Sequence, residues 1–456
     1  MYKQGFFITT LAMACLLLFA CHAKVPDIET QLQTTLAAQT VSPLDVSVAP
    51  DAAKVALGQM LFFDKELSGN RDISCATCHH PSQGSGDGLT VSIGTGGAGL
   101  GPARQIGYGR SFIPRNAPEV FNRGSAEWTT MFWDNRVIIQ DGGFHTPAGD
   151  SLPAGLDNIL AAQAMFPVTS ADEMRGLAGD EDVRGSVNEL ALLPGDDLPA
   201  IWAGLMTRLF TYPEYVALFE AAYPGVPADE LTFAHAANAI AAFEIQAYTL
   251  PNSPWTNYLN GDASALSDLE KQGALLFYGD AGCATCHSGS LLTDQTPHAL
   301  AVPQVGPGKG DESPLDLGRW RETAVDADMY AFRTPSLHNV AVSGPYMHDG
   351  AFATLEAAVL HHLDPETSLL TYDPTLHLHP ELYDTFQNDP ALVAEMLEYV
   401  DLDLAPERPL TATEIEALLA FLQTLTDPAV NNLDQFVPGS VPSGLPVQDI
   451  VTQNSH

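Results

Sequence analysis

Two copies of the pattern Cys-x-x-Cys-His carry the clearest chemistry in this chain. One copy runs from Cys75 to His79 and the other from Cys283 to His287. Two thiols about one helical turn apart can bond the two vinyl groups of a haem, and the adjacent imidazole can then bind the iron. The pattern therefore predicts two covalently attached c-type haems. Their predicted attachment and proximal residues are Cys75, Cys78 and His79, and Cys283, Cys286 and His287.

A Cys-x-x-Cys pair has two other common uses, as half of a zinc site and as a redox-active dithiol. A structural zinc site needs a second pair of ligands nearby, and a dithiol does not need a histidine directly after it. The two copies also account for every cysteine beyond residue 21. These observations favour haem over both alternatives.

Residues 1–23 are predicted to form a secretory signal peptide. An apolar run from Phe6 to Ala20 follows a lysine, which is typical of the hydrophobic region of such a peptide. The residues that end at Cys21 resemble a lipobox, which would make Cys21 a lipid anchor, and cleavage after Ala23 is the alternative. Because bacteria attach haem c outside the cytoplasm, we expect a periplasmic protein or one associated with the outer membrane or cell surface.

The composition restricts the partners of the chain. The 456 residues include 19 basic and 56 acidic side chains, which gives a net charge of −37. Nucleic acids and anionic membrane surfaces are excluded as expected partners, because binding to phosphates needs a basic face. A cationic protein or a calcium ion fits this charge better. The length and the 45% hydrophobic content indicate two domains with ample cores.

The apolar pattern predicts a mainly α-helical fold with long Gly- and Pro-rich loops. Segments 55–64 and 270–279 place apolar residues at helical spacing shortly before each haem motif. Both contain the pattern Gly-x-x-Leu-Phe, which indicates an internal duplication. We therefore expect two cytochrome c-like domains that each carry one haem, over residues 24–255 and 256–456.

Two further helices are predicted with defined ends. Phe233–Tyr248 has a strong helical pattern, followed by a break at the prolines 251 and 254. Residues 411–425 form an amphipathic pattern in which Thr411 is a candidate N-cap and Glu414 can complete a capping box. The boundary between the two domains is placed near residue 255.

The order of the motifs resembles that of the bacterial di-haem cytochrome c peroxidases and their relative MauG, over nearly all of the mature chain. The matching segments besides the two haem motifs are Leu57–Phe63, Leu67–Asn70, Pro114–Pro118, Phe132–Asp134, Thr334–Leu337 and Pro345–Gly350. The resemblance implies an exported di-haem oxidoreductase that consumes hydrogen peroxide.

In that family peroxide reacts at the N-terminal haem, whose distal pocket is lined by a Gln and a Glu ten residues apart. Gln163 and Glu173 match this spacing. A carboxylate can take a proton from one peroxide oxygen and return it to the other, so that water leaves. The resemblance therefore implies that Glu173 is the general acid and base, assisted by Gln163.

One position departs from the peroxidases at this haem. Thr95 stands where they carry a histidine that caps the resting iron. A hydroxyl is a poor iron ligand, so we expect an open site that accepts peroxide while both irons are ferric, as in MauG. Three other side chains remain alternative ligands, namely His80, Tyr108 and His145.

The C-terminal haem has a second departure. Fourteen residues after the histidine of the Pro-Tyr-Met-His-Asp-Gly motif, the peroxidases carry a distal Met and MauG carries a Tyr. Counted from His348, this place is occupied by His362. We therefore expect His287 and His362 to bind this iron together, with Met347 as the competing ligand and His361 as the next.

The resemblance assigns two further roles between the haems. Trp133 matches the tryptophan that lies between the two irons and could carry oxidising equivalents between them. Asn116 matches the side chain that binds a calcium ion in the family, with the carbonyls of Ser343 and Pro345 beside it. Hard oxygen ligands suit calcium, and water must complete its shell.

Several functions are compatible with such a site. The preferred hypothesis is a MauG-like oxidation of a residue, such as a tryptophan, on a partner protein. The alternatives are a peroxidase that receives electrons from a small cytochrome c or cupredoxin, a non-catalytic di-haem electron carrier or sensor, and a dioxygenase of the rubber-oxygenase type. Two segments outside the shared pattern, residues 137–158 and 294–328, are candidate docking loops.

Overall fold

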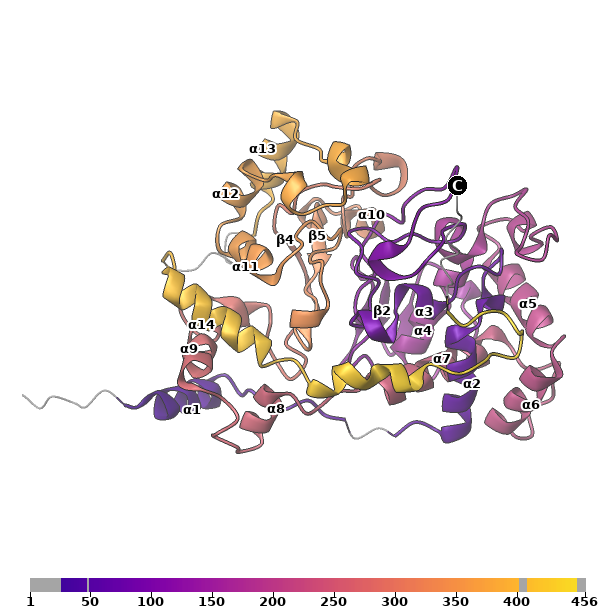
Figure 1. Cartoon of the computed structure of the whole chain (residues 1–456), viewed down its shortest axis with the longest axis horizontal. Helices are drawn as coiled ribbons and strands as arrows, with labels where there is room; N and C mark the ends of the chain where they lie inside the picture. The colour runs from indigo at the N-terminus through magenta and orange to yellow at the C-terminus, as the bar shows by residue number, and fades with distance from the viewer. Residues whose placement is uncertain (1–25, 47–48, 402–407, 449–456) are drawn as a thin grey trace, which may run out of the picture.

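The computed structural model describes residues 26–46, 49–401 and 408–448, which form two adjoining lobes (Figure 1). The predicted signal peptide and Cys21 lie outside these residues. No helix in the described ranges has the length and apolar character needed to cross a membrane. The fold is mainly helical, as predicted, and its helices are separated by long irregular segments.

The secondary structure has the following bounds. The helices are α1 Ile28–Ala38, α2 Ala52–Phe63, α3 Cys75–Cys78, α4 Ile159–Ala164, α5 Leu198–Leu209, α6 Pro213–Ala222, α7 Phe233–Tyr248, α8 Pro254–Leu259, α9 Asp268–Phe277, α10 Trp320–Thr323, α11 Leu355–Leu363, α12 Pro365–Leu370, α13 Pro390–Glu398 and α14 Ala412–Gln423. The strands are β1 Thr130–Met131, β2 Val137–Gln140 and β3 Gly143–His145, which form one antiparallel sheet, and β4 Pro297–Ala299 and β5 Ala331–Arg333, which form another.

Both helices with predicted ends are confirmed. Helix α7 begins at Phe233 and ends at Tyr248, and nearly all its side chains are buried. Helix α14 is capped by Thr411, whose hydroxyl accepts a hydrogen bond from the backbone N–H of Glu414 at 3.3 Å. The Glu414 carboxylate accepts one from the Thr411 N–H at 2.8 Å. These two bonds form the predicted capping box and satisfy backbone donors that the helix itself leaves unpaired.

The two Gly-x-x-Leu-Phe patterns lie at equivalent helix crossings. Helix α2 packs against α7, and helix α9 packs against α14. A Cβ atom on Gly58 would lie 1.8 Å from the carbonyl oxygen of Ala239, and one on Gly273 would lie 1.9 Å from that of Ala417. Only glycine therefore allows either close approach. The shared crossing explains the repeated pattern and agrees with an internal duplication.

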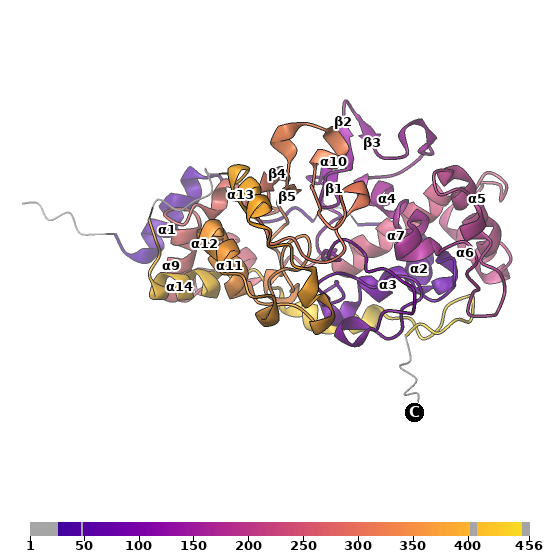
Figure 2. The same cartoon turned by 90° about the horizontal axis from the view of Figure 1, so that it is seen from above.

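The chain termini cross between the lobes (Figures 1 and 2). Helix α1 packs against α9, and its Leu32 and Leu36 join the apolar core of the C-terminal lobe. In the other direction, Leu433 joins the core of the N-terminal lobe, and the Ser443 hydroxyl donates to Asp64 at 2.6 Å. The domain boundary near residue 255 remains a proposal. The N-terminal segment packs on the C-terminal lobe, and the C-terminal segment packs on the N-terminal lobe.

We expect Gly273→Ala to destabilise the protein, because the new methyl group meets the backbone of α14. Overpacking of this kind costs about 1–3 kcal/mol. Thermal unfolding followed by circular dichroism would measure the loss. Gly439→Ala is the matched control, since a Cβ there meets nothing within 4 Å. Equal melting temperatures for the two variants would contradict the proposed crossing.

Candidate functional site

A large apolar cavity in the C-terminal lobe contains the second Cys-x-x-Cys-His motif. It encloses about 1510 Å³ of space not filled by atoms, part of which is open to solvent. Cys283, Cys286 and His287 all line this cavity, together with residues from α9, α11 and α14. The apolar walls and the position of the two cysteines fit a covalently attached haem.

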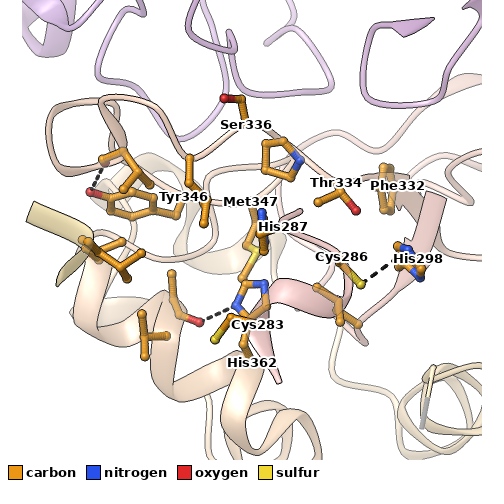
Figure 3. Close-up of a pocket in the computed structure, with 18 of the residues that line it drawn as sticks. Cys283, Cys286, His287, His298, Phe332, Thr334, Ser336, Tyr346, Met347 and His362 are labelled. Atoms are coloured by element: carbon orange, nitrogen blue, oxygen red, sulfur yellow. Dashed lines mark hydrogen bonds between the residues drawn. The ribbon is translucent and has the colours of Figure 1, made fainter. Parts of the chain in front are cut away.

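His287 and His362 face each other across this cavity (Figure 3). Their ring centroids are 6.3 Å apart. Metal–imidazole bonds are about 2.0–2.1 Å long. A ring nitrogen lies about 1.1 Å from its ring centroid, so two imidazoles on opposite sides of one metal have centroids about 6.3 Å apart. The separation therefore fits a single iron held between His287 and His362.

Backbone carbonyls fix the tautomer of all three predicted haem histidines. Nδ1 pairs with a carbonyl oxygen in each case, at 3.2 Å from Ser85 for His79, 3.2 Å from Leu292 for His287 and 2.8 Å from Ala358 for His362. A carbonyl can only accept, so the proton is on Nδ1 and the Nε2 lone pair is free for a metal. Burial lowers the pKa of each of these rings, which favours the neutral form that a metal requires.

The two competing ligands lie in different places. Met347 lines the same cavity as His362, so it remains a competitor. His361 is fully buried, and both its ring nitrogens have partners, Ser368 at 3.0 Å and the carbonyl oxygen of Leu300 at 2.9 Å. The carbonyl claims the Nε2 proton, which leaves only Nδ1 to accept from the Ser368 hydroxyl. These contacts favour His362 over His361.

The first motif lies in the core of the N-terminal lobe. Cys75 and Cys78 begin and end the single-turn helix α3, and His79 follows directly. The hydroxyl of Tyr248, at the end of α7, donates to the carbonyl oxygen of His79 at 3.2 Å. Helix α7 thus supports the residue that is predicted to bind the first iron.

Glu173 and Thr95 lie next to each other in this lobe. Glu173 belongs to a π-helical turn, Ala171–Arg175, and its carbonyl oxygen accepts a hydrogen bond from the Thr95 N–H at 2.9 Å. The Thr95 hydroxyl donates to Asp72 at 2.8 Å. The Asp72 carboxylate also accepts from the Gly96 N–H at 2.6 Å. The Asp72 carboxylate therefore binds both the hydroxyl of Thr95 and the backbone of the loop that contains it.

The environment of Glu173 alters its acidity. Burial raises the pKa of this carboxyl above its ordinary value, and the positive charges of Arg136 and Lys309 oppose the rise. Besides burial, the negative charge of Glu173 also raises the pKa of the Cys78 thiol. The carboxylate therefore lies within electrostatic range of the first haem motif. Gln163 is partly buried on α4, ahead of the π-helical turn. The predicted pair thus lies on two short helical elements that are separated by the turn Pro167–Thr169.

The three alternative ligands for the first iron have other positions. Tyr108 is completely exposed, and His145 on β3 is exposed as well. His80 is buried, and its Nδ1 lies 2.7 Å from the hydroxyl of Ser82.

Trp133 borders the cavity that contains the second haem motif. Its indole N–H donates to the carbonyl oxygen of Asn116 at 3.0 Å, and its own carbonyl oxygen accepts from the Arg333 N–H at 2.7 Å. Its side chain lines the cavity of the C-terminal lobe although the residue belongs to the N-terminal one. This position fits a side chain that links two redox centres.

A cluster of buried charges holds Trp133 in place. The next residue, Asp134, is fully buried and contacts three cations, Arg115 at 2.5 Å, Arg136 at 3.0 Å and Lys309 at 3.1 Å. Arg115 also pairs with Asp316 at 2.6 Å. Burial alone raises the pKa of Asp134, but the cations outweigh it and hold the pKa well below its ordinary value. Lys309 and Asp316 belong to the predicted docking segment 294–328, so part of that segment joins the lobes.

The predicted calcium residues line one cavity wall. Asn116, Ser343 and Pro345 all border the C-terminal cavity. The Asn116 side-chain nitrogen donates to the carbonyl oxygen of Leu89 at 2.7 Å, which leaves its amide oxygen for another partner. This donor set consists of hard oxygens, as calcium requires.

Sequence reasoning missed His298 and the stacking of His348. His298 lines the cavity and lies between Asp294 and Asp401, at 2.9 and 2.8 Å. The hydrogen bond to Asp294 raises the pKa of His298 well above its ordinary value. The His348 ring stacks on Phe332 with centroids 3.4 Å apart. The contacts of His298 with Asp401 and of His348 with Phe332 join residues well separated in the chain, so no local pattern predicts them.

The chain is similar in sequence to known proteins. Residues 52–264 match the family described as di-haem cytochrome c peroxidase. The chain is 34% identical over 311 residues to the methylamine utilization protein MauG of Methylorubrum extorquens, covering 68% of each protein. It is 32% identical to the cytochrome c peroxidase Ccp of Escherichia coli, over 70% of this chain and 55% of that protein. It is also 32% identical to the cytochrome c551 peroxidase of Pseudomonas aeruginosa, over 66% and 69%.

Solved structures show the same fold. A MauG-like protein associated with microbial copper homeostasis superposes with a TM-score of 0.57 at 27% identity, over 86% of this chain and 94% of that one. The di-haem peroxidase BthA of Burkholderia thailandensis gives a TM-score of 0.54 at 22% identity, over 89% and 93%, which supports the fold alone. The chain therefore belongs to the di-haem cytochrome c peroxidase family, a class of peroxide-dependent oxidoreductases with c-type haem that also contains MauG.

Proposed function

We propose that this chain is an exported, MauG-like enzyme that uses hydrogen peroxide to oxidise a residue, such as a tryptophan, on a partner protein. The observation that carries the proposal is the environment of Thr95, whose hydroxyl is bound to Asp72 beside the Glu173 turn. No histidine occupies this place, so the N-terminal site is open to peroxide without prior reduction. The haems, when bound at His79 and at His287 with His362, supply the electron transfer that reduces peroxide to water.

Glu173 performs the proton transfers in this proposal. Its carboxylate would take a proton from one oxygen of hydrogen peroxide and return it to the other, which leaves as water. Gln163 holds the peroxide by hydrogen bonding. Trp133 carries the oxidising equivalents toward the C-terminal lobe, whose cavity it lines.

His362 distinguishes the second site from that of the peroxidases. An imidazole donates more strongly to ferric iron than a thioether does, and thioether ligation raises the potential of a haem. A haem held by two imidazoles is therefore suited to sharing oxidising equivalents with the first. We also propose a calcium ion at Asn116, Ser343 and Pro345, and export to the periplasm or to the cell surface, with Cys21 as the anchor in the second case.

A second candidate function is peroxide detoxification with electrons from a small cytochrome c or cupredoxin. The net charge of −37 suits docking of a basic donor, and relatives of similar identity are named cytochrome c peroxidases. In this alternative the active site is the same and the electrons come from the donor.

Replacement of Thr95 tests the proposed function directly. We expect Thr95→His to supply the missing iron ligand, convert the N-terminal haem from high spin to low spin, and prevent the ferric protein from reacting with peroxide until it is reduced. Electron paramagnetic resonance (EPR) and stopped-flow absorbance would record both changes. Thr95→Val is the control that removes only the hydroxyl and should keep the site open. If the wild-type N-terminal haem is itself low spin, the proposal is wrong.

Glu173 should determine the pH dependence of the peroxide reaction. Its pKa is raised, so at low pH the carboxyl is protonated and cannot accept the first proton, and the rate should rise as pH increases through this raised pKa. We expect Glu173→Gln to slow the reaction by about 10²–10⁴-fold and to remove this rise. Asp172→Asn changes the neighbouring exposed carboxylate and should keep the rise, shifted to lower pH, because the charge of Asp172 contributes to the raised pKa of Glu173. An unchanged pH profile in the Gln variant would exclude the assigned role.

The ligand of the second iron can be assigned by a pair of variants. We expect His362→Ala to convert the low-spin EPR signal of one haem to high spin, because the iron loses an axial ligand. Met347→Leu should leave that signal unchanged. The opposite result would identify Met347 as the ligand.

A further inference from the structure

Three aromatic rings stack in the C-terminal lobe. The ring of Trp255 stacks with those of Tyr258 and Tyr278, with centroids 5.8 Å apart in each pair and interplanar angles of 15° and 24°. All three side chains are buried. We refer to Tyr258, Trp255 and Tyr278 as the Trp255 stack.

The Trp255 stack begins at the wall of the haem cavity. Phe277 lines that cavity, and its ring centroid lies 5.0 Å from that of Tyr278. Cys283, which is predicted to hold the haem, packs against the same apolar cluster as the stack. The backbone N–H of Trp255 donates to the carbonyl oxygen of Thr424 at 3.0 Å, which fixes α8 to the end of α14. A continuous aromatic path therefore leads away from the cavity.

The outer end of the stack has a built proton acceptor. The Tyr258 hydroxyl donates to the carboxylate of Glu29 at 3.1 Å, and Lys271 pairs with the same carboxylate at 2.8 Å. The Glu29 side chain is 28% exposed, so the path ends next to solvent. Helix α1, which contains Glu29, packs against α9 at the end of the molecule opposite α5 and α6 (Figures 1 and 2).

The two tyrosines differ in one respect that decides their chemistry. A phenol that loses an electron must also lose its proton, and a hydrogen-bonded carboxylate can take it. Tyr258 has such a partner. The buried hydroxyl of Tyr278 has no hydrogen-bond partner within the described ranges. Tyr258 can therefore become a neutral radical, whereas Tyr278 can only pass the electron along its ring.

We propose that Tyr258 is a redox-active residue that donates one electron through Trp255 and Tyr278 to the C-terminal haem site after peroxide has oxidised the protein. This inference rests on the proposed function, which supplies the oxidant. Hydrogen peroxide takes up two electrons from the protein and two protons from solvent as it becomes two water molecules. One electron comes from Tyr258, whose phenolic proton moves to Glu29, and the other comes from the haem site, which stays oxidised by one equivalent.

The proposal gives the oxidising equivalent a defined resting place when no partner protein is bound. The radical would lie beneath the α1 face of the C-terminal lobe, distant from the Glu173 site. A buried tyrosine beside a carboxylate is shielded from direct reaction with solvent, and the neighbouring Glu29 allows the proton to return when the electron does.

The test is freeze-quench EPR of the full-length, haem-loaded protein after one equivalent of hydrogen peroxide. We expect wild type to give a tyrosyl radical signal that narrows when the protein contains ring-deuterated tyrosine. Tyr258→Phe should lose this signal, because phenylalanine keeps the aromatic ring but lacks the phenolic hydroxyl that gives up its proton. Tyr278→Phe is the matched control within the stack and should retain it.

Absorbance of the haems in the same samples separates this inference from the proposed function. Haem oxidation in wild type and in both variants, with a radical missing only in Tyr258→Phe, would support both. Haem oxidation without a tyrosyl radical, or with equal radical in Tyr258→Phe, would overturn the inference and leave the proposed function intact. Haems that do not respond to peroxide would overturn both, because no oxidant would reach the stack.

Discussion

The buried ion cluster around Asp134 is the contact on which the arrangement of the two sites depends. Asp134 is fully buried and contacts Arg115 and Arg136 from its own lobe and Lys309 from the other. Breaking a buried ion pair by removing one partner costs about 3–5 kcal/mol, since it leaves a charge without compensation. The cluster therefore helps to set the relative position of the lobes, together with the terminal segments that cross between them. Trp133, the preceding residue, is held by it at the wall of the C-terminal cavity.

A second constraint operates at the scale of single side chains. His79, His287 and His362 each have Nδ1 against a backbone carbonyl oxygen. The local fold therefore determines which nitrogen carries the proton and which is free for iron. Since the acceptors are carbonyls of the same or nearby segments, each site is organised by its own lobe. The link between sites then depends only on how the lobes meet.

The structural features that depend on a local sequence pattern were predicted correctly. The limits of α7, the capping box at Thr411 and the helices before each haem motif follow from short-range periodicity, and the structure has them. The contacts that join distant segments were not predictable, because no local signal records them. Lys309 reaches Asp134, and Glu29 reaches Tyr258, across long stretches of chain. The insertion at 294–328 looked like a docking loop in sequence, yet two of its residues complete the cluster between lobes. The roles of Glu173, Gln163 and His362 remain predictions that their positions support.

The central claim is that the N-terminal site is open in the fully ferric protein. The most direct test is an optical and EPR titration of the as-isolated, fully oxidised protein with one equivalent of hydrogen peroxide and no prior reduction. The account predicts one high-spin and one low-spin haem at rest, and rapid oxidation of the haems by peroxide. Two low-spin haems at rest, or no reaction until one haem is reduced, would contradict it and place the protein with the reductively activated peroxidases or the electron carriers.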